Sequence, residues 1–140
     1  MSDYETDVLE WSEQQAALLR RAAAGERVND LDWPNIIEEI EGVGQSELHS
    51  VQSLLLQALA HILKADAWPQ SREVPGWRGE ALRFRSDAAD RFTPSMRQRI
   101  DLAKIYRRAV RITPETIDGQ PPLPVPELCP MTLDELLNEA

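Results

Sequence analysis

The sequence predicts an all-α fold, a four-helix up-and-down-like bundle with one long central helix, a C-terminal proline-rich strap and a short terminal helix. Three observations support this class. Apolar residues recur at helical spacing in four segments, proline or glycine separates these segments, and no segment alternates as a strand does. A length of 140 residues is enough for one core, so we expect residues 1–140 to form a single domain.

The long central helix is predicted over residues 34–64. Asp32 and Pro34 mark its start, because an Asp side chain accepts backbone N–H groups and proline suits the first helical turn. An apolar arc as wide as this one must be covered on more than one side. Its members include Ile36, Ile40, Val43, Val51, Leu54, Ala58 and Ile62.

Capping residues, glycines and prolines place the other elements. Thr6 or Asp7 can cap a first helix that Gly25 ends, and Thr93-Pro94 opens a fourth helix. The last segments hold five prolines without helical period, followed by a Thr132 cap. The predicted elements are helices at 6–24, 77–91 and 94–112, an extended strap at 118–131 and a short helix at 132–138.

Charge is distributed unevenly along the chain. Residues 1–66 carry a net charge of −9, residues 67–112 of +6 and residues 113–140 of −6. The basic segment either pairs with the acidic first half or forms a patch for an acidic partner. We expect no binding to duplex nucleic acid, because phosphate neutralisation dominates that affinity and this chain is acidic. The patch would contain Arg83, Arg97, Arg99, Lys104, Arg107, Arg108 and Arg111.

Three further features indicate the compartment. The longest apolar run, around residues 54–63, is too short to span a bilayer. The acidic N-terminus lacks a secretory pattern, and the single Cys129 cannot form an internal disulfide. We therefore expect a cytoplasmic protein without a membrane partner.

Metal and cofactor chemistry finds little support. A di-iron bundle needs Glu three residues before each ligating His, but Ser46 precedes His49 and Ala58 precedes His61. Zinc-binding patterns are absent from the sequence. We expect no metal and no cofactor.

One catalytic pattern remains as an alternative. Glu38-x-x-Glu41 and Asp87-x-x-Asp90 could hold Mg²⁺ between two helices, as in all-α nucleotide pyrophosphohydrolases. Antiparallel packing would, however, leave these pairs more than about two turns apart. Acids spaced in this way are also common on ordinary helix surfaces.

Histidine and tryptophan positions each have two interpretations. His61 lies in an apolar run, which is typical of a hydrogen-bonded core residue, and the alternative is proton transfer to a facing carboxylate. Trp33 and Trp68, both beside prolines, either pack at helix ends or anchor a partner.

The order of several segments resembles a bacterial family of small proteins, the domain-of-unknown-function family 29. The matching segments are YETDVLEWSEQQAALLR, LDWPNIIEEIEGVGQSE, LLLQALAHILK, the WR at Trp77 and LCPMTLDELL. The resemblance covers nearly the whole chain and implies an all-helical fold, a bacterial origin and no established activity. The polar residues and the tryptophan that it singles out are Asp7, Trp11, Asn35, Glu38, Glu39, Glu41 and His61.

We interpret the chain as a non-enzymatic protein-interaction module that binds a protein partner or self-associates through apolar surface on its second and fourth helices. Its expected partner-binding residues are Trp33, Trp68, Arg107 and Arg108. The alternative is a small hydrolase, with or without a metal. Its candidate catalytic residues are Glu38, Glu39, Glu41, His61 and Asp7, which would converge in one pocket.

Overall fold

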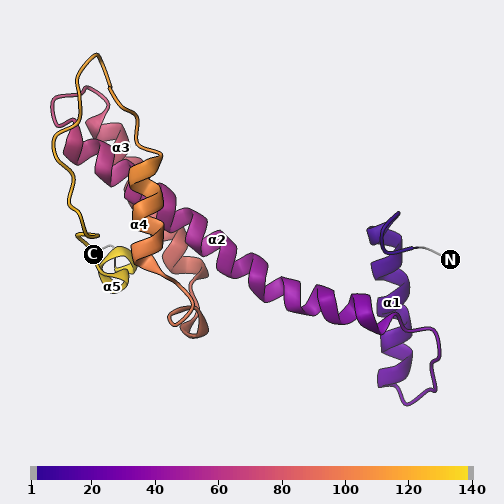
Figure 1. The fold of residues 1–140 in the computed structure, drawn as a ribbon. Helices are drawn as coiled ribbons and strands as arrows, with labels where there is room; N and C mark the ends of the chain where they lie inside the picture. The colour runs from indigo at the N-terminus through magenta and orange to yellow at the C-terminus, as the bar shows by residue number, and fades with distance from the viewer. Residues whose placement is uncertain (1–2, 139–140) are drawn as a thin grey trace. The chain divides into compact units, whose positions relative to one another are not determined.

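The computed structural model describes residues 3–138, and this part of the chain is helical. It contains five α-helices and one 3₁₀ helix (Figure 1). They are α1 (Val8–Ala23), α2 (Trp33–Ala67), α3 (Val74–Arg91), η1 (Pro94–Met96), α4 (Leu102–Arg111) and α5 (Leu133–Leu137). The predicted all-α class is confirmed.

Backbone contacts group the chain into two compact units, Met1–Gln45 and Ser46–Ala140, which we name the N-terminal unit and the C-terminal unit. α2 contributes its first turns to the N-terminal unit and its remaining turns to the C-terminal unit. The prediction of one domain arranged as an up-and-down-like bundle stays a prediction.

The ends of α1 follow the local sequence. The Asp7 carboxylate accepts a hydrogen bond from the backbone N–H of Glu10 at 3.1 Å and so caps the helix. Gly25 lies just beyond the helix with a φ of +94°, a conformation that glycine adopts without a steric penalty. The loop that follows leads into α2.

The buried interior of the N-terminal unit is small. Trp11 and Ile36 are its buried hydrophobic residues, and Gln15 is buried beside them. Asp32 connects these groups: its backbone N–H donates to Oε1 of Gln15 at 2.8 Å, and its carboxylate accepts from Nε1 of Trp11 at 2.9 Å. Polar bonds therefore support an interior with few apolar side chains.

The C-terminal unit has a larger core, formed by the second half of α2 together with α3, α4 and α5 (Figure 1). Burying one large apolar side chain contributes roughly 1.5–3 kcal/mol. Several such side chains are fully buried here, which makes this core the main source of stability in the unit. The largest of them are Tyr106, Leu55, Leu59, Leu136 and Val51.

The proline-rich strap is held to this core by polar bonds. Nε1 of Trp68 donates a hydrogen bond to the carbonyl oxygen of Gln120 at 2.8 Å. The hydroxyl of Tyr106 donates one to the carbonyl oxygen of Pro126 at 2.6 Å. The backbone N–H of Leu123 donates to the carbonyl oxygen of Ala67 at 2.9 Å. The strap is therefore fixed along its length.

The short helix α5 is held from two directions. Thr132 and Glu135 form a reciprocal capping box at its start. At its end, the guanidinium of Arg85 on α3 donates to the carbonyl oxygens of Leu136 at 3.0 Å, Glu135 at 2.8 Å and Asn138 at 3.2 Å. These bonds satisfy helix-end carbonyls that lack partners within the helix.

The predicted fourth helix at 94–112 is wrong in its first half. Pro94 opens only the short helix η1, and α4 begins at Leu102. Asp101 has an extended backbone, and its carboxylate accepts from the backbone N–H of Lys104 at 3.1 Å. An Asp side chain that caps in this way competes with helix continuation, which explains the new start.

The predicted start of the third helix is also three residues late. α3 begins at Val74, because Pro75 lies within its first turn, where a missing N–H donor has no cost. α2 continues to Ala67, three residues beyond its predicted end.

Candidate functional site

The candidate catalytic residues of the N-terminal unit mostly have structural roles. Asp7 caps α1. Glu39 accepts a hydrogen bond from the hydroxyl of Tyr4, whose ring packs edge-on against Trp11 with centroids 4.7 Å apart. This bond to an anion raises the pKa of the Tyr4 hydroxyl to about 12.

The Asp32 carboxylate accepts several hydrogen bonds in the N-terminal unit. Its Oδ2 accepts hydrogen bonds from Nδ2 of Asn35 at 2.8 Å and from Nε1 of Trp11 at 2.9 Å. Both bonds stabilise the charged form and lower the pKa of the carboxyl below its ordinary value of 3.8. Sequence reasoning took Asp32 only as a helix cap and missed its bond to Trp11, although both residues lie in segments of the family resemblance.

Glu38 and Glu41 are exposed on the first turns of α2. Arg21 forms an ion pair with Glu26 in the loop at 3.5 Å, and no ion pair joins either acid to another residue of the described chain.

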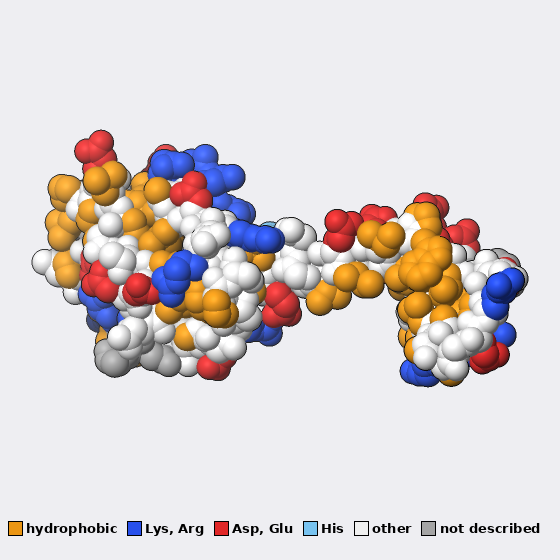
Figure 2. Space-filling model, turned by 90° about the horizontal axis from the view of Figure 1, so that it is seen from below, with side chains coloured by type: hydrophobic (Ala, Val, Ile, Leu, Met, Phe, Trp, Pro, Cys, Tyr) orange, Lys and Arg blue, Asp and Glu red, His pale blue; other side chains and the backbone are white. Residues whose placement is uncertain are grey.

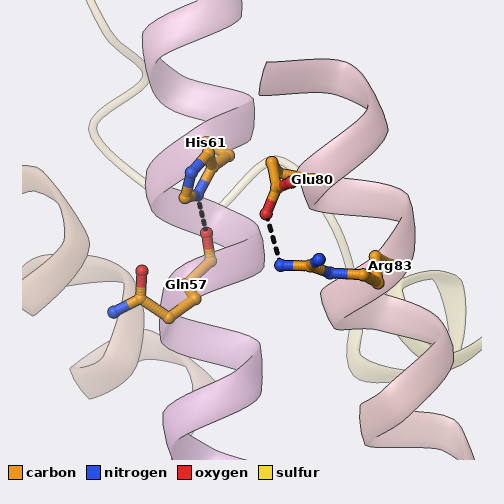
Figure 3. A network of polar contacts seen from close by, with 4 residues as sticks. All are labelled: Gln57, His61, Glu80 and Arg83. Atoms are coloured by element: carbon orange, nitrogen blue, oxygen red, sulfur yellow. Dashed lines mark hydrogen bonds and ion pairs between the residues drawn. The ribbon is translucent and has the colours of Figure 1, made fainter. Parts of the chain in front are cut away.

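His61 is a half-buried residue with a local partner (Figure 3). Its Nδ1 lies 2.7 Å from the carbonyl oxygen of Gln57 one turn earlier in α2, and its ring packs at 5.4 Å from that of Phe84. Glu80 nearby on α3 is paired with Arg83 at 2.6 Å. These contacts agree with a hydrogen-bonded packing residue.

The hydrolase alternative receives no support from these positions. His61 belongs to the C-terminal unit, and the carboxylates with which it was expected to converge belong to the N-terminal unit. Asp87 and Asp90 line a depression of about 490 Å³ with His49, Ser50 and Ser53 of α2. The second carboxylate pair thus lies beside residues of α2 that follow Ser46. Within residues 3–138, no three His, Cys, Asp or Glu side chains form a group that could hold a metal ion.

An exposed apolar stripe marks the start of α2. Trp33, Ile37, Ile40 and Val43 follow one another at spacings of three and four residues, and each is 52–68% exposed. Figure 2 shows hydrophobic side chains gathered over the N-terminal unit with acids beside them. We name these four residues the apolar stripe. Trp33 is therefore accessible, as a partner anchor must be.

Most of the apolar side of α4 faces the core of the C-terminal unit, although Ile112 just after the helix is 51% exposed. Leu102, Ile105 and Val110 of α4 pack partly buried against the core of the C-terminal unit. Trp68, the other expected partner anchor, is only 4% exposed, because it lies under the strap and bonds to Gln120. Trp68 is thus a packing residue, and its expected anchoring role is wrong.

The polar side of α4 is cationic. Lys104, Arg107, Arg108 and Arg111 are exposed at spacings of three and four residues, so they share one face. We name them the cationic face. Within the described chain none of them forms an ion pair, in contrast to Arg97, which binds Asp134 at 2.6 Å.

Two hollows flank the cationic face. One lies against the strap, has a volume of about 550 Å³ and is lined by Arg107, Arg111 and Val125 among others. The other lies between α4 and α2 and has a volume of about 310 Å³. Lys104 lines both, so the cationic face separates two potential binding surfaces.

No helix of the described chain is both long enough and apolar enough to cross a bilayer.

Comparison with known proteins decides the family. The family model described as Domain of unknown function DUF29 matches residues 4–140. The chain belongs to the DUF29 family. The suspected family is confirmed, and no curated protein was found to match this DUF29 chain.

A solved structure supports the fold of this DUF29 protein. The crystal structure of an α-helical protein of unknown function from Rhodospirillum rubrum is similar with a TM-score of 0.71 and 33% sequence identity. The match covers 99% of this chain and 91% of that chain. The family is described as a domain of unknown function and the solved structure as an α-helical protein of unknown function, and neither description indicates an enzymatic activity.

The residues that the resemblance singled out can now be given positions in the DUF29 fold. Asp7, Trp11, Asn35 and Glu39 all take part in bonds at the start of α1, at the start of α2 or between these two segments. Their roles are structural, so their match to the family does not by itself indicate a catalytic site. Glu38 and Glu41 have no such role.

Proposed function

We propose that this DUF29 protein is a non-enzymatic protein-interaction module and that the apolar stripe of α2 is its docking surface. The observation that supports the proposal is the exposure of four large apolar side chains in a row, Trp33, Ile37, Ile40 and Val43. Contiguous apolar surface of this kind marks interaction sites on soluble proteins.

The balance of buried and exposed residues supports the same conclusion. The N-terminal unit buries Trp11 and Ile36 but leaves the larger apolar set on its surface, including Val8 and Leu9 of α1. An amphipathic helix normally turns its apolar side inward. A partner that covers the stripe would contribute roughly 1.5–3 kcal/mol for each large side chain that it buries fully.

Charge identifies the kind of partner. Residues 1–45 contain eleven acids and three bases, a net charge of −8. Glu41 lies one turn after Ile37 and forms no ion pair with another described residue, so it flanks the stripe with a negative charge. The proposed occupant is a cationic amphipathic segment of another protein, with apolar residues on one side and Lys or Arg beside them.

We also propose a cytoplasmic location and a protein partner in place of duplex nucleic acid. A lone Cys129, half-buried and bonded through its Sγ to the carbonyl oxygen of Met131 at 3.3 Å, suits a reducing compartment. The net charge of −9 opposes binding to a polyphosphate duplex.

A labelled amphipathic peptide of Leu and Lys tests the docking surface by fluorescence anisotropy. We expect the wild-type protein to bind it, and Ile37→Ser or Ile40→Ser to weaken binding by about tenfold or more, because each variant removes a buried contact. Leu82→Ser on α3 is the matched control, since Leu82 is 49% exposed and lies outside the stripe.

Three results would contradict the proposal. They are that the wild-type protein binds no peptide, that the stripe variants bind as tightly as Leu82→Ser, or that the protein forms a dimer that Ile40→Ser abolishes. Analytical ultracentrifugation detects the last result, which would make a second copy of the chain the occupant.

A further inference from the structure

The hollow between α2 and α4 combines positive charge with neutral hydrogen-bonding groups. We name it the α2–α4 groove. Its volume is about 310 Å³, at the lower end of the range of small-molecule pockets. It is lined by His49, Gln52, Ser53 and Leu56 of α2 and by Arg99, Asp101, Lys104, Ile105 and Arg108 on the α4 side.

Positive charge exceeds negative charge in the lining of the α2–α4 groove. Arg99, Lys104 and Arg108 line it, and none of them forms an ion pair with a described residue. Asp101 also lines the groove, but its carboxylate is engaged as the cap of α4, bonded to the backbone N–H of Lys104 at 3.1 Å. The groove therefore has a net positive lining.

The cationic face places like charges one turn apart on α4. Like charges at spacings of three and four residues destabilise a helix by about 0.2–0.5 kcal/mol for each pair. Lys104, Arg107, Arg108 and Arg111 form such pairs, and solubility alone would be served as well by mixed charges. An anion bound beside α4 would offset this repulsion.

The α2 side of the groove offers polar side chains. His49, Gln52 and Ser53 are three and four residues apart and so share one side of α2. Their imidazole, amide and hydroxyl groups can donate hydrogen bonds to oxygen. Below them, Leu56 belongs to the buried core and Ile105 packs against it, so the base of the groove is apolar and firmly held.

We propose that the α2–α4 groove binds a small molecule that carries a phosphate group. Arg99 and Arg108 would bind the phosphate oxygens through their planar N–H pairs, and Lys104 would add a point charge. Three cations suit a dianionic phosphate better than a singly charged carboxylate. The remaining volume would accept the uncharged part of the molecule against Leu56 and Ile105.

The surroundings limit the site to the α4 side. His49 and Ser53 also line the neighbouring depression, where Asp87 and Asp90 are found. Those two acids would repel a phosphate on the α3 side. The apolar stripe lies outside the groove, so this proposal does not depend on the docking of a protein partner.

Isothermal titration calorimetry with pyrophosphate tests the proposal on the full chain. We expect the wild-type protein to bind, and Arg99→Ala or Arg108→Ala to weaken binding by about tenfold or more, as expected for loss of a charge-assisted bond. Arg108→Lys should retain part of the affinity. The matched control is Arg107→Ala. It removes the same charge from the same helix, but Arg107 lines the other hollow.

Arg107→Ala should change the affinity by less than about twofold, because charges outside the groove are screened by salt. Circular dichroism would show that each variant keeps its helices. The proposal is overturned if pyrophosphate gives no binding heat, if Arg107→Ala and Arg108→Ala weaken binding equally, or if malonate binds as tightly as pyrophosphate.

Discussion

Nε1 of Trp11 donates a hydrogen bond to the carboxylate of Asp32 across 2.9 Å and so joins α1 to the residue that precedes α2. The same carboxylate accepts from Asn35, and the backbone N–H of Asp32 donates to Gln15. The N-terminal unit, with few buried apolar residues, is thus organised around one charged acceptor.

Replacing Trp11 removes the largest buried side chain of this unit together with its hydrogen bond. We expect Trp11→Ala to destabilise the unit by about 3–5 kcal/mol, the usual cost of truncating a buried aromatic residue. Amide hydrogen exchange would measure the loss of protection in α1. Unchanged exchange in α1 would show that the Trp11 contacts contribute nothing to its stability.

Asp32 makes the stability of the N-terminal unit sensitive to acid. The bonds to Asn35 and Trp11 lower the pKa of Asp32 in the folded state. Its charged carboxylate therefore stabilises the folded state at pH values above 3.8, the ordinary pKa of the group. This contribution is lost as the pH falls below that value toward the lower pKa of the folded state. Thermal melts of Asp32→Asn should show a weaker pH dependence in this window than wild-type melts.

Both tyrosines should resist ionisation in the folded protein. The bond to Glu39 raises the pKa of Tyr4 to about 12, and burial raises the pKa of Tyr106. An ultraviolet titration of the native protein should therefore show no phenolate step near 10, the ordinary tyrosine value. Glu39→Ala should return one tyrosine toward that value.

The pH dependence of stability that Tyr4 contributes has the opposite direction to that of Asp32. A raised pKa favours the neutral phenol, so its contribution to stability is present below pH 10 and is lost as the pH rises toward about 12. If Glu39→Ala leaves the titration curve unchanged, the Tyr4–Glu39 bond does not form in solution.

Arg85 should matter more than its neighbour Arg83. Arg85→Ala removes three hydrogen bonds to the end of α5, and we expect a loss of about 1.5–3 kcal/mol, typical of bonds to a charged donor. Arg83→Ala removes an exposed pair with Glu80 and should cost less than about 1 kcal/mol. Urea unfolding of the two variants would compare them, and equal losses would contradict the role of Arg85.

The sequence was most informative where structure depends on nearby residues. Asp7 caps α1, Gly25 follows its end and Thr132 caps α5, as predicted, because each interaction joins residues within about four positions. The same reasoning missed the cap formed by Asp101, since Thr93-Pro94 offered an earlier and stronger start signal.

The candidate sites were less predictable. Exposure of Trp33 and burial of Trp68 could not be separated by sequence, since both tryptophans lie beside prolines at helix ends. The α2–α4 groove was missed although its signals were visible as two spacing patterns, one in His49, Gln52 and Ser53 and one in Lys104 and Arg108. Spacing shows which residues share a helix face, but it does not show which two faces meet.

By itself the sequence determined the helical class, most helix ends and the family, because helix formation follows from local spacing and caps. Only the tertiary structure showed the two compact units, the hydrogen bond that joins buried Trp68 to Gln120, and the hydrogen bond from Arg85 to Leu136. These contacts join residues about fifty positions apart in the chain. They depend on how apolar faces pack together, and many pairings are compatible with the same local pattern.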